Sequence, residues 1–192
     1  MSLLAPLNGL PLNVTMAARL LGVSHPTAVL RLRELERRAE IRILPSLVRA
    51  RRPTLYFRGS FDERPASFRA ACIEAVMSSL PGGRFACWTT GRVRRIDLVA
   101  EVAGQSVGFC FCRLPWKNAD WLSLAIGIKR GVITRGFLLH GGRRAYFVRR
   151  MVHALPVQSF LEEPLEWICS RREPRDAMEA MARINSRWLP LR

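Results

Sequence analysis

The stretch Ile96-Asp-Leu-Val-Ala-Glu-Val-Ala-Gly-Gln-Ser-Val-Gly-Phe-Cys-Phe-Cys112 decides the fold. It predicts two strands joined by a turn at Gly104-Gln105, because two apolar runs flank a glycine-bearing break. The second run is apolar at nearly every position, which is typical of a central strand buried on both faces. Asp97 lies near the start of the first strand, and Cys110 and Cys112 lie near the end of the second. We expect both cysteines to pack in the core, since a buried free cysteine behaves as a small hydrophobe.

The residues around this hairpin predict a mixed sheet flanked by helices. Helices are expected at Phe68 to Leu80 and at Asp120 to Arg130. Further strands are expected at Arg84 to Trp88, Gly136 to His140 and Ala145 to Val148. Beyond residue 160, Pro174 to Trp188 has apolar residues at helical spacing, so we expect a helical extension in residues 161–192. His140 and His153 are isolated in the sequence and are expected to be structural or surface residues.

Positive charge is the strongest signal in the composition. The 192 residues carry 31 Lys and Arg against 15 Asp and Glu, a formal net charge of +16. The excess lies in residues 1–60 (ten basic, three acidic) and 61–160 (15 basic, six acidic), whereas residues 161–192 are balanced. The electrostatic field of this excess positive charge attracts polyanions, and nucleic acid is the expected one. A solvated basic surface, or one that docks an acidic protein, stays as the alternative.

Hydropathy and cysteine usage limit the class of protein. A hydrophobic fraction of 49% is ample for a packed core, and no apolar run approaches the ~20 residues of a membrane span. Leu3 to Leu12 is apolar but lacks the basic region and cleavage site of a signal peptide. The five cysteines are odd in number and lack compact disulfide spacing, which favours a reducing cytoplasm. We therefore expect a cytoplasmic protein with no membrane partner.

The first 60 residues predict a helix-turn-helix. Asn13 is placed to cap a first helix that Gly22 ends, and Ser24 is placed to cap a second helix from about His25 to Ala39. Met16, Ala17, Leu20 and Leu21 follow at helical spacing in the first helix. In the second helix, Val29, Leu32 and Leu35 or Glu36 share a face, and Leu30 adds to it. Short strands then follow at Ile41 to Leu44 and Thr54 to Phe57, and the arginine-bearing loop between them has the layout of a wing.

In such a domain the N-terminal residues of the second helix face the major groove of DNA. The expected contacts there are His25, Thr27 and Arg31. Arg31 is favoured, because a planar guanidinium suits both base edges and phosphates. The expected phosphate contacts of the wing are Arg49, Arg51, Arg52 and Arg58. Two alternatives stay open: such domains can mediate protein contacts only, and helix arginines are often a solvated face.

In combination, these motifs resemble the C-terminal module of a group of prokaryotic AAA+ ATPases. There a winged helix leads into a PD-(D/E)XK nuclease-like domain of unknown function. The resemblance rests on Leu12-Asn13-Val14-Thr15, Ala17 to Thr27, Ile43-Leu44-Pro45, Arg51 to Phe57, Asp97-Leu98-Val99 and Ala154-Leu155-Pro156. It implies an α/β chain of mixed α+β type: a winged helix-turn-helix in residues 1–60, then a restriction-endonuclease-like mixed sheet flanked by helices in residues 61–160.

The same resemblance implies a catalytic hairpin, but its motif is incomplete here. In that superfamily an Asp on one strand and a Glu-x-Lys pair on the next bind a divalent metal and activate water. Asp97 is present, whereas Cys110-Phe111-Cys112 stands in place of the pair, and sulfur is a poor ligand for Mg²⁺. A helical acid that helps to bind metal would correspond to Glu74, facing Asp97. Alternatively, Glu74 is a surface residue or pairs with an arginine such as Arg95.

We therefore expect no catalytic residues, with Glu74 and Asp97 as residual candidates and Asp97 as the residual metal candidate. No cofactor is expected, and Mg²⁺ enters only if an atypical nuclease site operates. A zinc site that joins Cys110 and Cys112 to Cys87 or Cys72 would lack the usual closely spaced ligand pairs.

The expected function is a non-catalytic DNA-binding or regulatory module related to the C-terminal part of AAA+ ATPases. The alternatives are a metal-dependent DNA nuclease with an atypical site and a protein-interaction scaffold that binds an acidic partner. DNA is the expected partner, with an ATPase or another protein as a further candidate. The sequence contains no G-x-x-x-x-G-K-[ST] phosphate loop, so we expect either an excised C-terminal region or a stand-alone relative.

Overall fold

The predicted hairpin forms as β4 (Arg94–Val102) and β5 (Gln105–Cys112). Ala103 and Gly104 make the turn, with φ angles of 49° and 73°, and Val102 pairs with Gln105. Two central residues in the left-handed region give the tight turn whose twist suits an antiparallel pair. The prediction of a turn at Gly104-Gln105 is wrong by one residue, since Gln105 already belongs to β5.

The computed structural model describes residues 13–47, 54–57, 65–90, 94–113, 118–169 and 182. The other elements, in chain order, are α1 (Val14–Leu21), α2 (His25–Arg37), β1 (Ile41–Leu44), β2 (Thr54–Phe57), α3 (Pro65–Ser79), β3 (Arg84–Thr90), α4 (Asn118–Lys129), β6 (Arg135–His140), β7 (Tyr146–Arg149), β8 (Val152–Pro156), α5 (Val157–Glu162) and α6 (Pro164–Cys169).

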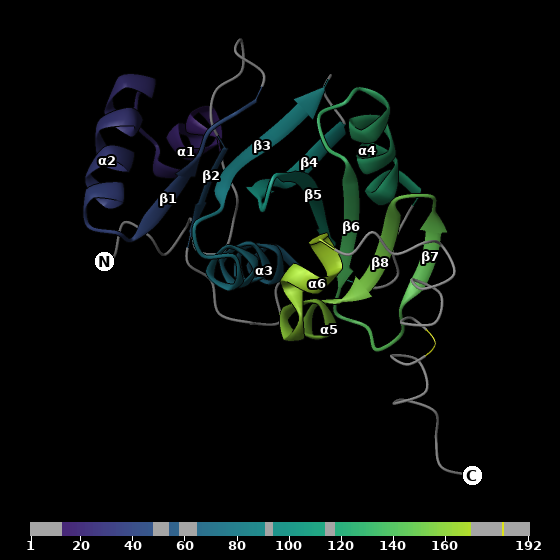
Figure 1. The fold of residues 1–192 in the computed structure, drawn as a ribbon. Coiled ribbons are helices and arrows are strands. Elements are labelled where there is room, and N and C mark those ends of the chain that lie inside the picture. Colours follow the sequence, from purple (N-terminus) through teal and green to yellow (C-terminus); the bar gives the residue numbers. More distant parts are fainter. Residues whose placement is uncertain are drawn as a thin grey trace.

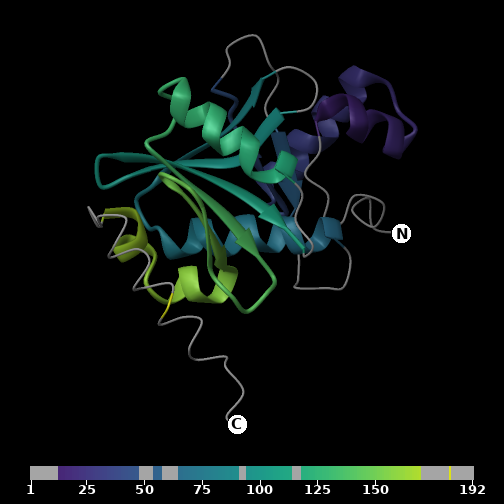
Figure 2. The same ribbon diagram turned by 90° about the vertical axis from the view of Figure 1, so that its right-hand side faces the viewer.

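Six strands form one mixed sheet in the order β3-β4-β5-β6-β8-β7. β3, β4 and β5 pair antiparallel, β6 and β8 are added in parallel, and β7 pairs antiparallel with β8. α4 connects β5 to the parallel strand β6, because parallel neighbours need a crossover. Figures 1 and 2 show α4 on one face of the sheet and α3, α5 and α6 on the other. The chain therefore has the predicted mixed sheet flanked by helices.

Each face of the sheet buries its own core. The core on the α3 side is aromatic, with the ring centroids of Phe109 and Phe137 5.5 Å apart and those of Phe109 and Phe160 5.3 Å apart. The core on the α4 side contains Cys110 and Cys112. β5 is therefore buried on both faces, and the prediction that its two cysteines pack in the core is confirmed.

The two N-terminal helices have the predicted caps, and part of their apolar spacing is buried. The side chain of Asn13 accepts from the backbone N–H of Met16, and that of Ser24 accepts from the backbone N–H of Thr27. A small core joins Ala17 on α1 to Leu32 and Leu35 on α2 and to Ile41 on β1. Other apolar residues at helical spacing are exposed: Met16 is 49% exposed, Leu20 46% and Leu30 66%.

After α2, β1 and β2 form a two-stranded antiparallel sheet in which Ile41 pairs with Phe57. Helix, turn, helix and two-stranded sheet thus follow in the predicted order. The predicted wing loop, residues 48–53, lies outside the described residues. Its form, and with it the winged-helix assignment, stays a prediction.

The N-terminal elements are joined to the large sheet at its β3 edge. The backbone N–H of Cys87 on β3 donates to Pro45 O at 2.8 Å, and Leu47 N–H donates to Cys87 O at 3.0 Å. Leu44 lies in the core on the α3 side. Residues 44–47 therefore cover part of the outer edge of β3, which limits pairing with another chain there.

The end of the chain contributes more to the sheet than the sequence predicted. β8, α5 and α6 were not predicted as separate elements. Trp167 and Ile168 on α6 are buried in the core on the α3 side, so this core continues past residue 160. The predicted helix at Pro174 to Trp188 lies outside the described residues, apart from Ala182. Within the described part, no helix has both the length and the apolar character of a membrane span.

Candidate functional site

Asp97 lies at an irregularity in the pairing of β3 with β4. Ala86 pairs with Val99 and Trp88 pairs with Ile96, so the single residue Cys87 opposes both Asp97 and Leu98. An extra residue of this kind is a β-bulge, which re-aims side chains and is common next to functional sites. Here Leu98 joins the core on the α3 side, whereas Ile96 and Val99 join the core on the α4 side. The bulge lets the neighbouring residues Asp97 and Leu98 both turn toward α3.

Both carboxylate oxygens of Asp97 accept from nearby donors. Arg95 Nε lies 2.7 Å from Oδ1. The backbone N–H of Phe111 donates to Oδ2 at 3.2 Å, and Arg69 Nε on α3 lies 3.4 Å from the same oxygen. Arg69 Nη2 also donates to Phe111 O at 3.4 Å. The side chains of Asp97 and Arg69 thus contact the backbone of Phe111, which lies past the Leu98–Phe109 pair where the β4–β5 ladder ends.

The electrostatics of this cluster are those of a buried, neutralised carboxylate. Asp97 is only 5% exposed, and a buried charge needs a partner of opposite sign. The Asp97 carboxylate raises the pKa of Arg95, against the opposing effect of burial. Burial, together with the charge of Asp97, raises the pKa of the Cys110 thiol well above its usual value. The cluster therefore carries two guanidinium groups, one carboxylate and a protonated thiol.

These residues do not fit a Mg²⁺ site. A hard cation needs several free oxygen ligands, but donors from arginine and backbone already engage both oxygens of Asp97. From α3 it is Arg69 that contacts Asp97. Glu74 forms an ion pair with Arg42 on β1 at 3.3 Å, so the expectation that it pairs with an arginine is confirmed, with Arg42 as the partner.

A zinc site built on Cys110 and Cys112 has no geometric support either. The two sulfurs pack in the core on the α4 side, whereas Cys72 and Cys87 pack in the core on the α3 side. Burial, with a smaller effect from the charge of nearby Cys112, raises the pKa of the Cys72 thiol to about 12, which disfavours the thiolate that zinc requires. Within the described ranges, no group of three His, Cys, Asp or Glu residues is arranged to hold a metal ion.

The second candidate site is the exposed side of α2. Thr27 and Arg31 are four residues apart and share a face of the helix, whereas His25 lies on a different face. All three are half-buried. The hydroxyl groups of Thr27 and Ser24 lie 2.8 Å apart and form a hydrogen bond, so Thr27 already takes part in the helix cap. Of these three predicted contacts, Arg31 is the best suited to reach a ligand.

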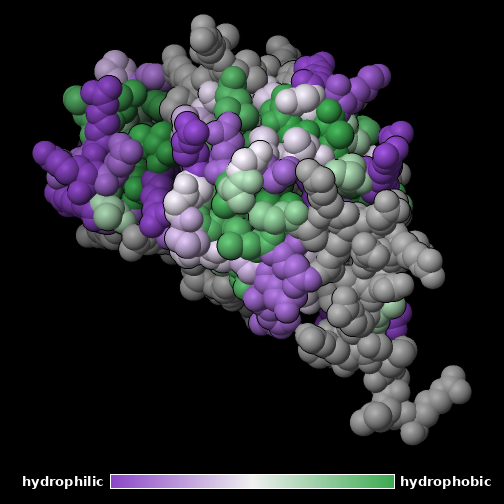
Figure 3. Space-filling model, viewed as in Figure 1, coloured by the Kyte–Doolittle hydropathy of each residue, from purple (hydrophilic) through white to green (hydrophobic). Residues whose placement is uncertain are grey.

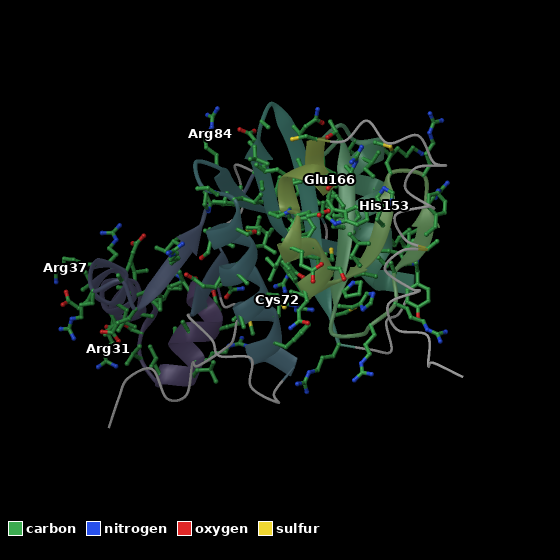
Figure 4. The ribbon with its side chains drawn as sticks, turned by 60° about the horizontal axis from the view of Figure 1, so that its bottom comes forward. Arg31, Arg37, Cys72, Arg84, His153 and Glu166 are labelled. Carbon is green, nitrogen blue, oxygen red and sulfur yellow. The ribbon has the colours of Figure 1, made fainter. Side chains whose placement is uncertain are left out.

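Additional arginines lie toward the end of α2. Arg33, Arg37 and Arg38 are exposed. Arg33 and Arg37 share a different face of the helix from Arg31, and Glu34 pairs with both Arg37 and Arg38. Figure 4 shows Arg31 and Arg37 pointing away from the body of the molecule, and Figure 3 shows hydrophilic side chains over α2. The predicted wing contacts lie outside the described residues: Arg49, Arg51, Arg52 and Arg58.

Sequence reasoning missed the two arginines that hold Asp97. Arg95 could have been found, because residues two apart on a strand share a face and the pair has opposite charges. Arg69 is 28 positions before Asp97 in the sequence and carries no comparable short-range signal.

Comparisons with known proteins do not assign this arrangement to a family. No protein-family model, curated protein or solved structure matches the chain.

Proposed function

We propose that this protein is a non-catalytic DNA-binding or regulatory module related to the C-terminal part of prokaryotic AAA+ ATPases. In this proposal α2 enters the major groove, with Arg31 as the principal contact. The observation that carries the proposal is the set of arginines on α2, the second helix of a helix-turn-helix, in which Arg31 is half-buried and Arg33 is exposed. The formal charge of +16 supports attraction to the phosphates of DNA.

The engagement of Asp97 supports the non-catalytic part of the proposal. A metal-dependent nuclease would have to release this carboxylate from Arg95, from Arg69 and from the Phe111 N–H before it could bind a cation. The nuclease alternative requires cleavage of DNA that depends on Mg²⁺ or Mn²⁺ and is lost in Asp97→Ala. Cleavage of this kind by the full chain would replace the proposal.

Duplex binding at graded salt concentrations tests the DNA contact. The affinity should fall steeply with salt, and each phosphate contact adds about 0.9 to the slope of log K against log salt. Arg31→Gln should weaken binding by about 1–3 kcal/mol if the guanidinium reads a base, or lower the slope by about 0.9 if it contacts a phosphate. Arg84→Gln is the matched control, because Arg84 is an exposed arginine on β3 and pairs with Glu101. Failure to bind any duplex at low salt, or equal losses in both variants, would refute the proposal.

A protein-interaction scaffold is the second candidate, and one observation favours it. Met16 and Leu20 lie four residues apart on α1 and are both nearly half exposed, and exposed apolar side chains that share a face often mark protein contacts. A partner bound there should be released by Met16→Ser with Leu20→Ser and retained by Arg31→Gln. The opposite pattern would support the DNA contact instead.

A further inference from the structure

The outermost strand of the large sheet carries an unusual run of side chains. Residues 143–150 read Arg-Arg-Ala-Tyr-Phe-Val-Arg-Arg, four arginines with no acid. Among the described strands, β7 is the last in the sheet and pairs only with β8. All four arginines are exposed. Tyr146 is 41% exposed and Phe147 47%. We call Arg143, Arg144, Tyr146, Phe147, Arg149 and Arg150 the β7 surface.

The two aromatic rings lie on opposite sides of the sheet edge. Neighbouring residues of a strand point to opposite faces, and the ring contacts agree with this. The ring of Tyr146 lies 6.0 Å from that of His140, and the ring of Phe147 lies 6.1 Å from that of His153. Both histidines are buried. Each exposed ring thus packs against a buried imidazole, which restricts its motion. A ligand that stacks on the ring therefore pays a smaller entropic cost for ordering it.

Exposed aromatic rings between pairs of arginines are suited to one kind of ligand. Arginines attract the phosphates of a nucleic acid, and aromatic faces stack on its bases. In a duplex the bases already stack on one another inside the helix, so a duplex offers this surface little besides its phosphates. A single strand offers both groups, and it can cross the sheet edge with a base on each ring.

We propose that the β7 surface binds single-stranded nucleic acid. Tyr146 and Phe147 stack on bases, and the arginine pairs at either end of β7 contact phosphates. Single-stranded DNA and RNA share this chemistry, so both are candidate ligands. The proposal does not depend on duplex binding by α2. β1 lies at the β3 end of the sheet and β7 is the strand at the other end, as Figure 1 shows.

The test measures the affinity of the full chain for three labelled probes: oligothymidylate, oligouridylate and a DNA duplex. Tyr146→Leu with Phe147→Leu keeps apolar bulk but removes the aromatic faces. Stacking energies of about 1–3 kcal/mol per base correspond to a loss of about fivefold to 150-fold for each ring. The affinity of the leucine variant for the single-stranded probes should fall by at least fivefold. Its affinity for the duplex should stay within about twofold of that of the unmodified chain. A higher affinity for the thymidylate or the uridylate probe shows whether single-stranded DNA or RNA is the better ligand.

A second pair of variants keeps the test decisive if the leucine substitutions disturb the fold. Arg149→Gln with Arg150→Gln alters only exposed side chains. If both contact phosphates, the salt slope for oligothymidylate should fall by about 1.4. Arg84→Gln with Lys129→Gln is the matched control, because both side chains are exposed and lie outside α2 and the β7 surface. It makes the same change in charge and should have no effect on that slope.

Three results would overturn the proposal. The first is the absence of single-strand binding by the unmodified chain at low salt. The second is an equal loss of single-strand and duplex affinity in the leucine variant, which would reduce the β7 surface to a general basic patch. The third is self-association that the leucine variant abolishes without a change in single-strand affinity. That outcome would assign the exposed edge to strand pairing between copies.

Discussion

Removing the carboxylate of Asp97 should destabilise the fold much more than removing an exposed carboxylate from the same strand. In Asp97→Ala, the buried N–H of Phe111 loses its acceptor, which costs about 1–3 kcal/mol. Arg95 and Arg69 lose their common partner, but their side chains are 31% and 37% exposed and can turn toward water. Loss of one partner from a fully buried ion pair costs about 3–5 kcal/mol. We therefore expect the free energy of unfolding of Asp97→Ala to be about 2–4 kcal/mol lower than that of the unmodified protein.

Glu101→Ala is the matched control for this loss. Glu101 also lies on β4 and pairs with an arginine, Arg84, but these side chains are 57% and 88% exposed and their charged atoms are 3.5 Å apart. Exposed ion pairs of this kind contribute about 0–1 kcal/mol. Asp97→Asn keeps an oxygen that can accept from the Phe111 N–H and should therefore lose less than Asp97→Ala.

The free energy of unfolding of each variant can be measured by urea denaturation followed by circular dichroism. Equal losses for Asp97→Ala and Glu101→Ala would refute the structural role of the Asp97 cluster. A gain in stability for Asp97→Ala would contradict it more strongly. Carboxylates held for function are often kept at a cost to stability, so a gain would favour the metal-binding alternative.

Three further predictions concern Cys169, His140 and Gly108. In the native protein Cys169, which is exposed, should react with a thiol reagent at pH 8 far faster than the four buried cysteines, and Cys169→Ser should remove that fast phase. Burial lowers the pKa of His140 to about 4, below the ordinary value of about 6.5. Its contribution to the stability of the native state is therefore fully present above about pH 6.5. It is lost as the pH falls toward 4. His140→Asn should show less of this acid loss in unfolding experiments, and an unchanged pH profile would refute the assignment. Gly108→Ala should cost about 1–3 kcal/mol in urea denaturation, because its Cβ would lie 2.6 Å from Ile133 Cδ1; a loss below about 0.5 kcal/mol would show that Ile133 yields freely.

The central hairpin could be predicted because its signal is local. Continuous apolar residues on β5 and a glycine-bearing break fix two strands, and the structure has them within a residue or two. The bulge at Asp97 could not be predicted in the same way. Ile96, Leu98 and Val99 are all apolar, and both faces of the sheet are buried, so a one-residue shift in register leaves no trace in the pattern of hydrophobicity.

The buried faces of α1 and α2 could not be fully predicted for a related reason. Helical spacing does not separate Met16, Leu20 and Leu30, which are largely exposed, from the apolar residues that are buried. The core between the helices is formed by Ala17 with Leu32, Leu35 and Ile41. Sequence periodicity gives the spacing of a helical face, but close packing decides which residues occupy it.

Some arginines of this protein form ion pairs beside the core, whereas others are exposed to solvent. Arg69 and Arg95 are engaged with Asp97 beside the core, so much of their charge is compensated locally. Arg33 on α2 and Arg149 and Arg150 at the end of β7 are exposed. A long-range field depends on solvent-facing charge more than on charge that is paired beside the core. We therefore expect the exposed groups at the two ends of the sheet, rather than the net charge of the chain, to decide where a polyanion binds, and the duplex and single-strand experiments vary these groups.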